Sequence, residues 1–245
     1  MLHLRLDGPI ARLLLDRPEA RNAIPVEAWP DIARLAKEAA RDGARVLILS
    51  GSAQAFSAGA DLAGFPALQA DEPARVRFRR AMREGIDGLA ASPLPSLALI
   101  EGPCFGAGVA LALACDVRIA APAATFAITP AKFGISYPQE DIARLVALVG
   151  PGQASRLLLG AQSIDACEAA RIGLVEIVAD DASAAALALA EAIVAASPAS
   201  HAALKRGIAL AARGTARDAD HDAAFDALFG SPDFAARFAA LRGGR

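Results

Sequence analysis

Cysteine and histidine are scarce in this chain of 245 residues. The three cysteines, Cys104, Cys115 and Cys167, lie far apart without a CxxC pair. We therefore expect no disulfide framework, and we interpret them as small buried side chains in a reducing compartment. The three histidines show neither HxxH nor HExxH spacing, so the sequence predicts no metal site. No Ser-His-Asp or Cys-His pattern supports a nucleophile, Cys104 included.

Excess charge and long apolar runs are also missing. Lys and Arg number 25 against 27 Asp and Glu, a net charge of −2 at pH 7, which argues against nucleic acid as the main partner. No apolar run reaches the ~18 residues that cross a membrane, and the N-terminus lacks a signal-peptide core. These features predict a cytoplasmic protein without a membrane partner. The basic stretch 75–80 is expected either to face solvent or to contact an anionic ligand tail.

Hydrophobic patterning predicts alternating strands and helices, followed by an alanine-rich helical region. This order is typical of α/β layering. We expect one continuous fold, without repeats or linkers. The expected strands span 3–6, 11–15, 45–50, 96–100, 117–120 and 126–128, and the expected helices span 26–41, 73–91, 109–115 and 141–149.

Two loops of small residues, 51–62 and 101–108, each follow a buried strand. Small residues let the backbone approach a ligand closely. The second loop leads into a helix, whose first N–H groups and positive dipole end suit a negatively charged oxygen. Two such donors converging on one point would form an oxyanion hole. By itself, Gly106-Ala107-Gly108 is equally compatible with tight helix–strand packing, and it is not a phosphate loop because Gly-Lys-Ser/Thr is missing.

Three ordered segments, 15–24, 56–62 and 102–116, closely resemble the enoyl-CoA hydratase/isomerase (crotonase) family, and the similarity continues through 145–150 and 169–175. The resemblance implies a spiral of ββα units over residues 1–180, with residues 181–245 forming helices that build trimers, often paired into hexamers. It also implies an acyl-CoA thioester as the ligand. Coenzyme A would then be part of the substrate, and no separate cofactor is expected.

The resemblance assigns roles residue by residue. The N–H groups of Ala60 and Ala107 match the two oxyanion donors, although the family usually has glycine at the second position. The positions expected to contact the substrate and its CoA moiety are Arg21, Ala23, Ala58, Ala60, Asp61, Leu62, Gly106, Ala107, Pro130 and Tyr137.

The two glutamates with which hydratases of the family activate water are missing. Counting along the matching segments places Ala110 and Pro130 at their positions. One carboxylate must deprotonate water while a proton reaches the α-carbon, and neither replacement can transfer a proton. Ordinary water addition through this pair is therefore not expected.

Segment 125–137 is similar to the subgroup that contains methylmalonyl-CoA decarboxylase, which also has Thr-Pro at the second glutamate position and a tyrosine three residues after the glycine. That decarboxylase keeps the first glutamate, where this chain has Ala110. Tyr137, the only tyrosine, is interpreted either as a half-buried aromatic or as a phenol that binds a substrate carboxylate or relays a proton. Asp141 and Glu140 are interpreted as a helix N-cap and a first-turn charge, or as a relocated acid/base.

Three hypotheses follow. The first is an enzyme that forms a thioester enolate by decarboxylation or with an unconventional base. The second is a divergent hydratase or isomerase that uses Glu140. The third is a non-catalytic acyl-CoA-binding or trimeric interaction protein. Resemblance to a superfamily indicates how the carbonyl is held, not which reaction follows.

Overall fold

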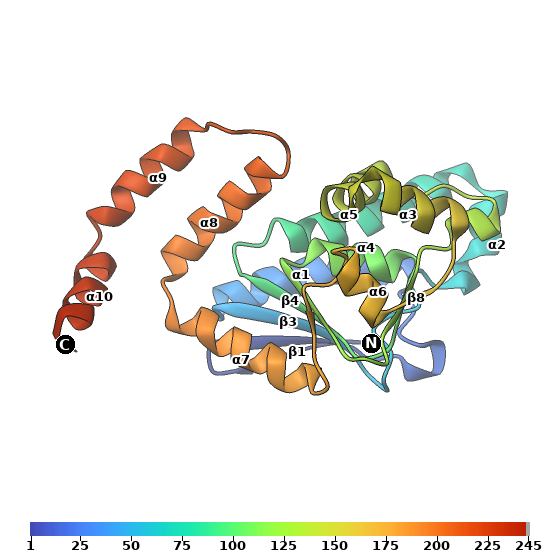
Figure 1. Ribbon diagram of the computed structural model, residues 1–245. Coiled ribbons are helices and arrows are strands. Elements are labelled where there is room, and N and C mark those ends of the chain that lie inside the picture. Colours follow the sequence, from blue (N-terminus) through green and yellow to red (C-terminus); the bar gives the residue numbers. More distant parts are fainter. Residues whose placement is uncertain (244–245) are drawn as a thin grey trace.

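The computed structural model describes residues 1–243 and contains a large mixed sheet with the strand order β1-β2-β3-β4-β6-β9 (Figure 1). β1 and β2 form an antiparallel hairpin, and every later neighbour in this sheet pairs in parallel. β3 and β4 are apolar on both faces because helices cover both sides of the sheet. The strands are β1 (Leu2–Asp7), β2 (Ile10–Leu15), β3 (Val46–Gly51), β4 (Ser96–Ile100), β6 (Val117–Ala120) and β9 (Ile177–Val178).

A second sheet of three short strands lies beside the first, in the order β5-β7-β8. Its members are β5 (Pro103–Phe105), β7 (Thr125–Ala127) and β8 (Ile164–Asp165). The chain runs from the large sheet to the small sheet and then into a helix, twice over: β4–β5–α4 (Ala107–Ala114) and β6–β7–α5 (Gln139–Gly160). A bridge between Ser57 and Cys104 brings the loop after β3 into the same arrangement. The predicted α/β spiral of ββα units is confirmed.

Helices cover the large sheet on both sides (Figure 1). On one side, α1 (Trp29–Arg41) packs against α3 (Glu72–Ala90), and their buried side chains include Trp29 and Ile86. On the other side, α7 (Ala182–Ala195) places Ala186 against strand residues such as Ile48. The sequence placed the start of the helical C-terminal region at residue 181. Because α7 belongs to this core, the main body extends beyond that boundary. The region that leaves the body begins only at α8 (Pro198–Ala211).

Several bounds differ from the prediction. A 3-10 turn, η2 (Val26–Ala28), precedes α1, and α2 (Phe65–Ala70) is a helix that the sequence did not predict. α4 begins two residues earlier than expected, at Ala107. α5 continues far beyond residue 149, with a kink at Gly150, whose φ is 73°. The remaining elements are η1 (Pro18–Ala20), η3 (Leu62–Gly64), η4 (Pro130–Phe133) and α6 (Ala166–Arg171).

The last three helices extend away from the body as an arm, coloured orange to red in Figure 1. They are α8, α9 (Ala219–Phe229) and α10 (Pro232–Gly243). Lys205 of α8 ties the arm to the body, because its Nζ lies 2.8 Å from both Leu94 O and Asp116 Oδ2. The arm carries a row of aromatic rings in which each contacts the next, formed by Phe225, Phe229, Phe234 and Phe238.

One helix of the described chain, α5, has the length and mean hydropathy of a membrane span, and α7 with α8 would pass the same test as one span bent by 112°. Buried helices of proteins without any membrane segment pass this test too, so it is weak evidence. Gly150 interrupts α5, and Asp141 and Leu145 of the same helix are fully buried.

Candidate active site

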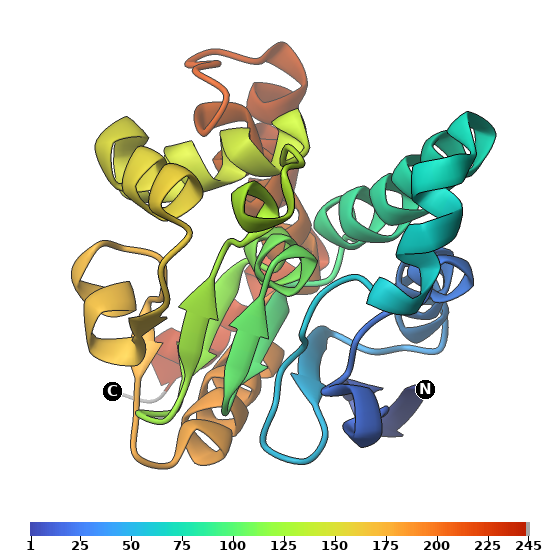
Figure 2. The same ribbon diagram turned by 90° about the vertical axis from the view of Figure 1, so that its right-hand side faces the viewer.

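A cavity of about 580 Å³ opens between the two small-residue loops, α3 and the segment that precedes α5. In Figure 2, α3 (teal) and α5 (yellow-green) lie on either side of α4, and both contact it. Most of the predicted site residues line this cavity together: Ala23, Ala58, Ala60, Asp61, Leu62, Gly106, Ala107, Pro130 and Tyr137.

Two predicted residues do not line it. The Arg21 side chain is exposed; its backbone carbonyl accepts a hydrogen bond from Ala58 N over 2.9 Å, which holds two loops together. The Glu140 side chain is 57% exposed and lies 4.0 Å from Arg83 Nη1. In this conformation Glu140 does not reach into the cavity.

The two loops touch at positions that only glycine can occupy. Gly59 has a φ of +94°, and a Cβ there would lie 2.7 Å from Phe105 O and 2.8 Å from Ala107 N. A Cβ on Gly108 would lie 2.6 Å from Ser57 O. Contacts this short would force the backbone apart. The missing side chains therefore let the loop of Ala60 lie against the start of α4.

The Ala60 N–H is directed toward a free side of its loop. Ile24 N donates to Gly59 O over 2.8 Å, and Asp61 N donates to Ile24 O over 3.0 Å. These two bonds form a parallel bridge that flanks Ala60, so the N–H of Ala60 itself points away from Ile24. Within residues 1–243 no acceptor pairs with this N–H, and Ala60 lines the cavity.

The Ala107 N–H is free for a different reason. Ala107 is the first residue of α4, and the first N–H groups of a helix have no acceptor within the helix. Gly106, the N-cap, has φ 53° and ψ −120°, a conformation that side-chain-bearing residues avoid. The sequence predicted a helix from Val109, whereas Ala107, which the family resemblance matches to an oxyanion donor, is itself the first helical residue. Two free N–H groups at a cavity wall can bind an oxygen that carries negative charge.

A polar side chain that no sequence motif indicated, Asn22, holds these loops. The Asn22 side chain is fully buried, and its Nδ2 donates to Ala55 O over 2.8 Å and to Ser52 O over 3.0 Å. Its φ of 57° is one that asparagine tolerates better than most residues. The only signal in the sequence was an asparagine within a polar loop.

Asp61 is the only carboxylate that lines the cavity in the described chain. Its Oδ1 accepts from Ala63 N over 3.0 Å, and its Oδ2 accepts from Arg17 Nη1 over 2.6 Å. The Ala63 N–H, followed by Arg17, lowers the pKa of Asp61. The carboxylate is therefore ionised and already bonded, which makes it a poor general base.

Tyr137 is buried at the cavity wall, and its hydroxyl donates to Gly106 O over 3.0 Å. Desolvation, and next the nearby Asp141, raise the pKa of the phenol well above its usual range. The hydroxyl proton is thus donated to the backbone. The sequence left two interpretations open, a half-buried aromatic or a phenol that binds a substrate carboxylate or relays a proton, and in this conformation the hydroxyl is already bonded to the protein.

Asp141 is not the helix N-cap that the sequence suggested. Pro138 occupies that position, and Asp141, in the first turn of α5, is fully buried. Its carboxylate accepts from Arg83 Nη2 over 2.6 Å and from Arg144 Nη1 over 3.1 Å. Burial raises the pKa of Asp141, and Arg83 opposes this. Asp141 therefore joins α5 to α3 and does not contact the cavity.

The remaining candidates divide between core and surface. Ala110 is fully buried in the core, whereas Pro130 lines the cavity. Cys104 is fully buried, and desolvation raises the pKa of its thiol well above the usual range, which agrees with an inert side chain. Cys167 is exposed, so the expectation of three buried cysteines was wrong for it. From the basic stretch 75–80, Arg79 lines the cavity.

Fold and cavity define a protein built on a ββα spiral with a cavity beside two glycine-containing loops. The sequence model of the enoyl-CoA hydratase/isomerase family matches residues 6–230. The chain belongs to this family, as the resemblance predicted.

Individual relatives agree. The chain is 35% identical to the "probable enoyl-CoA hydratase" echA14 of Mycobacterium tuberculosis, over 98% of this chain and 96% of the relative. It is 38% identical to the "probable enoyl-CoA hydratase" echA6 of Mycobacterium bovis, where the match spans only 65% of this chain and 63% of the relative.

Solved structures show the same fold. A family member from Hyphomonas neptunium superimposes with a TM-score of 0.95 at 34% identity, over 100% of this chain and 95% of that one. An enoyl-CoA hydratase/carnithine racemase from Magnetospirillum magneticum gives a TM-score of 0.94 at 31% identity, over 100% and 93%.

Proposed function

We propose that the protein binds an acyl-CoA thioester in this cavity and holds the thioester carbonyl oxygen between the N–H groups of Ala60 and Ala107. The observation that carries the proposal is this pair of free donors, both at the wall of one cavity. Such donors stabilise the negative charge that develops on the oxygen as an enolate forms. Arg79 and Lys132 also line the cavity and suit the phosphates of coenzyme A.

The reaction we favour needs no carboxylate from the protein. The family positions of the two hydratase glutamates correspond to Ala110 and Pro130, and Asp61 is bonded to Arg17. In a malonyl-type thioester, the bond between Cα and the carboxylate can break without an external base. Its electron pair moves to the carbonyl oxygen as the enolate forms, carbon dioxide leaves, and Cα then takes a proton from water. The two relatives named above are described as probable enoyl-CoA hydratases, so decarboxylase-like chemistry would set this protein apart from that description.

The experiment is a direct comparison of crotonyl-CoA and methylmalonyl-CoA as substrates. General acid–base groups typically contribute 10²–10⁴-fold each, so we expect feeble or no hydration of crotonyl-CoA and measurable loss of carbon dioxide from methylmalonyl-CoA. Crotonyl-CoA turnover on the order of 10 s⁻¹ or more would contradict the proposal. If Glu140→Gln then abolished that turnover, the divergent hydratase or isomerase would be correct, with Glu140 moved into the cavity.

A second candidate function is acyl-CoA binding without catalysis. It is favoured by the same observation that disfavours hydration, namely that no unbonded carboxylate from residues 1–243 lines the cavity. Tight binding of acyl-CoAs by calorimetry, without turnover of any of them, would support this function over the enzyme.

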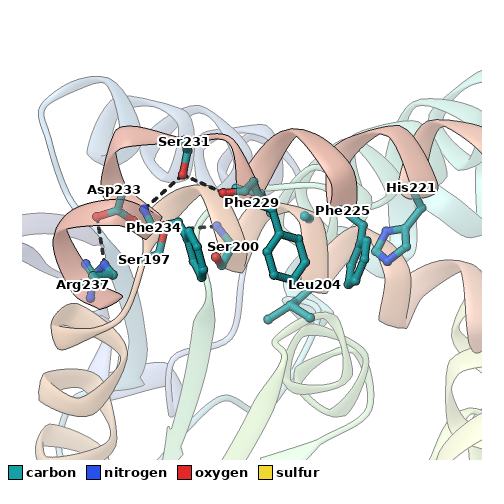
Figure 3. Close-up of a pocket in the computed structure, with 12 residues that line it drawn as sticks. Ser197, Ser200, Leu204, His221, Phe225, Phe229, Ser231, Asp233, Phe234 and Arg237 are labelled. Atoms are coloured by element: carbon teal, nitrogen blue, oxygen red, sulfur yellow. Dashed lines mark hydrogen bonds and ion pairs between the residues drawn. The ribbon is translucent and has the colours of Figure 1, made fainter. Parts of the chain in front are cut away.

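For the arm we propose self-association into a homotrimer, or two trimers paired into a hexamer. Figure 3 shows Phe225, Phe229 and Leu204 facing one groove between the arm helices. Phe225 and Phe229 remain 59% and 57% exposed in the single chain. Exposed apolar side chains that lie together in this way are typical of a protein–protein interface. Sedimentation analysis should give the mass of three or six chains, and Phe229→Ser should lower it; a monomeric wild type would contradict this.

A further inference from the structure

The Tyr137 hydroxyl bonds to one end of the peptide group whose other end is a proposed oxyanion donor. The phenol donates to Gly106 O over 3.0 Å, and the Gly106 carbonyl and the Ala107 N–H belong to the same planar peptide unit. We infer that Tyr137 is a positioning residue that orients and polarises the Ala107 N–H through this carbonyl. The inference rests on the proposed function, in which this N–H binds the thioester oxygen.

The Gly106–Ala107 peptide needs such support because it follows an unusual glycine conformation. At Gly106 a Cβ would meet nothing closer than Thr129 Oγ1 at 3.9 Å, so the glycine is required by its backbone angles and not by space. Gly106 N is fixed by a 2.8 Å bond to Ala127 O. The next peptide can still turn about the bonds on either side, and its direction determines where the Ala107 N–H points.

The Gly106 carbonyl already accepts from Val109 N over 3.0 Å, and more weakly from Ala110 N over 3.4 Å. Both belong to the short helix α4. The phenol adds a strong donor from outside the helix. Hydrogen bonds at the two ends of one peptide reinforce each other by polarisation. A donor on the carbonyl therefore makes the Ala107 N–H a better donor toward an oxygen in the cavity.

The tyrosine is itself held firmly. Pro138 restricts the backbone of Tyr137 to extended conformations and is the N-cap of α5. One turn later, Asp141 is bonded to Arg83 of α3 over 2.6 Å. Tyr137 as a whole is only 8% exposed, so little water reaches its side chain. A connected path thus runs from α3 through Asp141 and Tyr137 to the peptide of the donor.

The test compares two ligands that differ at the carbonyl. Octanoyl-CoA labelled with carbon-13 at the thioester carbonyl reports polarisation through its infrared stretching frequency, and S-octyl-CoA, a thioether, has no carbonyl oxygen. The wild type should bind both and shift the labelled stretch to lower frequency. In Tyr137→Phe we expect a smaller shift and a weaker affinity for octanoyl-CoA, by at most about tenfold, the size of one whole hydrogen bond, because the Ala107 N–H still binds the ligand but is less polarised. The affinity for S-octyl-CoA should be unchanged.

Two controls separate positioning from shape. Phe133→Leu alters the wall without touching the Gly106 carbonyl, so it should affect both ligands alike. Because Tyr137 is the only tyrosine, growth on 3-fluorotyrosine labels this residue alone and makes its phenol a stronger donor, which should increase the carbonyl shift even if Tyr137→Phe folds poorly.

Equal loss for both ligands in Tyr137→Phe, or a carbonyl shift that 3-fluorotyrosine leaves unchanged, would overturn the role of Tyr137 alone. A wild type that binds neither ligand, or that binds octanoyl-CoA without any carbonyl shift, would overturn the proposed function and this inference with it.

Discussion

Arg17 and Asp61 are 44 positions apart in the chain, yet Arg17 Nη1 lies 2.6 Å from Asp61 Oδ2. The contact joins the loop after β2 to the residue that follows Ala60. The Arg17 side chain is 29% exposed and that of Asp61 only 17%, so solvent screens the pair less than a typical surface ion pair. It ties the Ala60 loop to the loop after β2 and keeps the Asp61 carboxylate bonded.

This pair predicts a pH dependence of stability. The folded pKa of Asp61 lies below its ordinary value of 3.8. Asp61 therefore stabilises the fold above that value, and the contribution is lost as the pH falls through the folded pKa. Asp61→Asn should be less stable than wild type near neutral pH, and the difference should shrink as the pH falls below about 3.8.

Urea unfolding at a series of pH values measures the difference. Asp42→Asn removes an exposed carboxylate paired only with its neighbour Arg41 over 3.4 Å, and it should follow wild type throughout. A constant difference between Asp61→Asn and wild type across the acid range would show that the carboxylate charge contributes nothing.

The fold was predictable where short stretches of sequence determine it. β3 and β4 contain short apolar runs, 46–49 and 97–100, whose length and flanking residues are typical of a buried strand. β8 and β9, of two residues each, exist because other strands offer them hydrogen bonds, and no local pattern indicates that.

The same distinction holds at the site. The small residues of the two loops were visible in the sequence, and their family match identified Ala60 and Ala107. The residues that hold these loops in place were not visible. Tyr137 bonds to Gly106, 31 positions away in the sequence, and Arg83 bonds to Asp141, 58 positions away. Long-range pairs of this kind are set by packing, which one sequence does not reveal.

Gly59 should tolerate no side chain. Gly59→Ala places a methyl group 2.7 Å from Phe105 O and 2.8 Å from Ala107 N at a φ of +94°. Gly43→Ala is the matched control, because Gly43 has a φ of +93° with nothing within 4 Å. Gly43→Ala should lose only the free energy of unfolding that a positive φ costs an alanine, about 1 kcal/mol. Gly59→Ala should lose more stability by urea unfolding and should also weaken acyl-CoA binding. Equal losses would mean that the loops are free to separate.

Asp141→Asn should destabilise the protein strongly. It removes the charge that Arg83 and Arg144 share, and breaking a buried ion pair typically costs about 3–5 kcal/mol. The neighbouring Glu140→Gln is the control: its carboxylate is 57% exposed and 4.0 Å from Arg83, so the change should stay within about 0.5 kcal/mol. Chemical unfolding of the three proteins measures both values. A loss below about 1 kcal/mol for Asp141→Asn would indicate that water replaces the carboxylate easily.

Ala107→Pro should abolish one donor while leaving the helix intact. Proline lacks an N–H and is well tolerated at the first position of a helix, where no intrahelical bond is lost. Gly106 can precede it, because φ 53° and ψ −120° mirror an extended conformation. Removing one oxyanion donor typically lowers the rate on the order of 10²–10³-fold, so we expect a loss of that size on the best substrate found.

The control for Ala107→Pro is another proline at the start of a helix. Ala219 is the exposed first residue of α9, and its predecessor Asp218 is extended, with φ −152° and ψ 117°. Ala219→Pro should therefore fold normally and keep full activity. Circular dichroism and thermal unfolding establish that both variants are folded before their rates are compared. A folded Ala107→Pro protein with wild-type turnover would show that the Ala107 N–H does not bind the substrate oxygen.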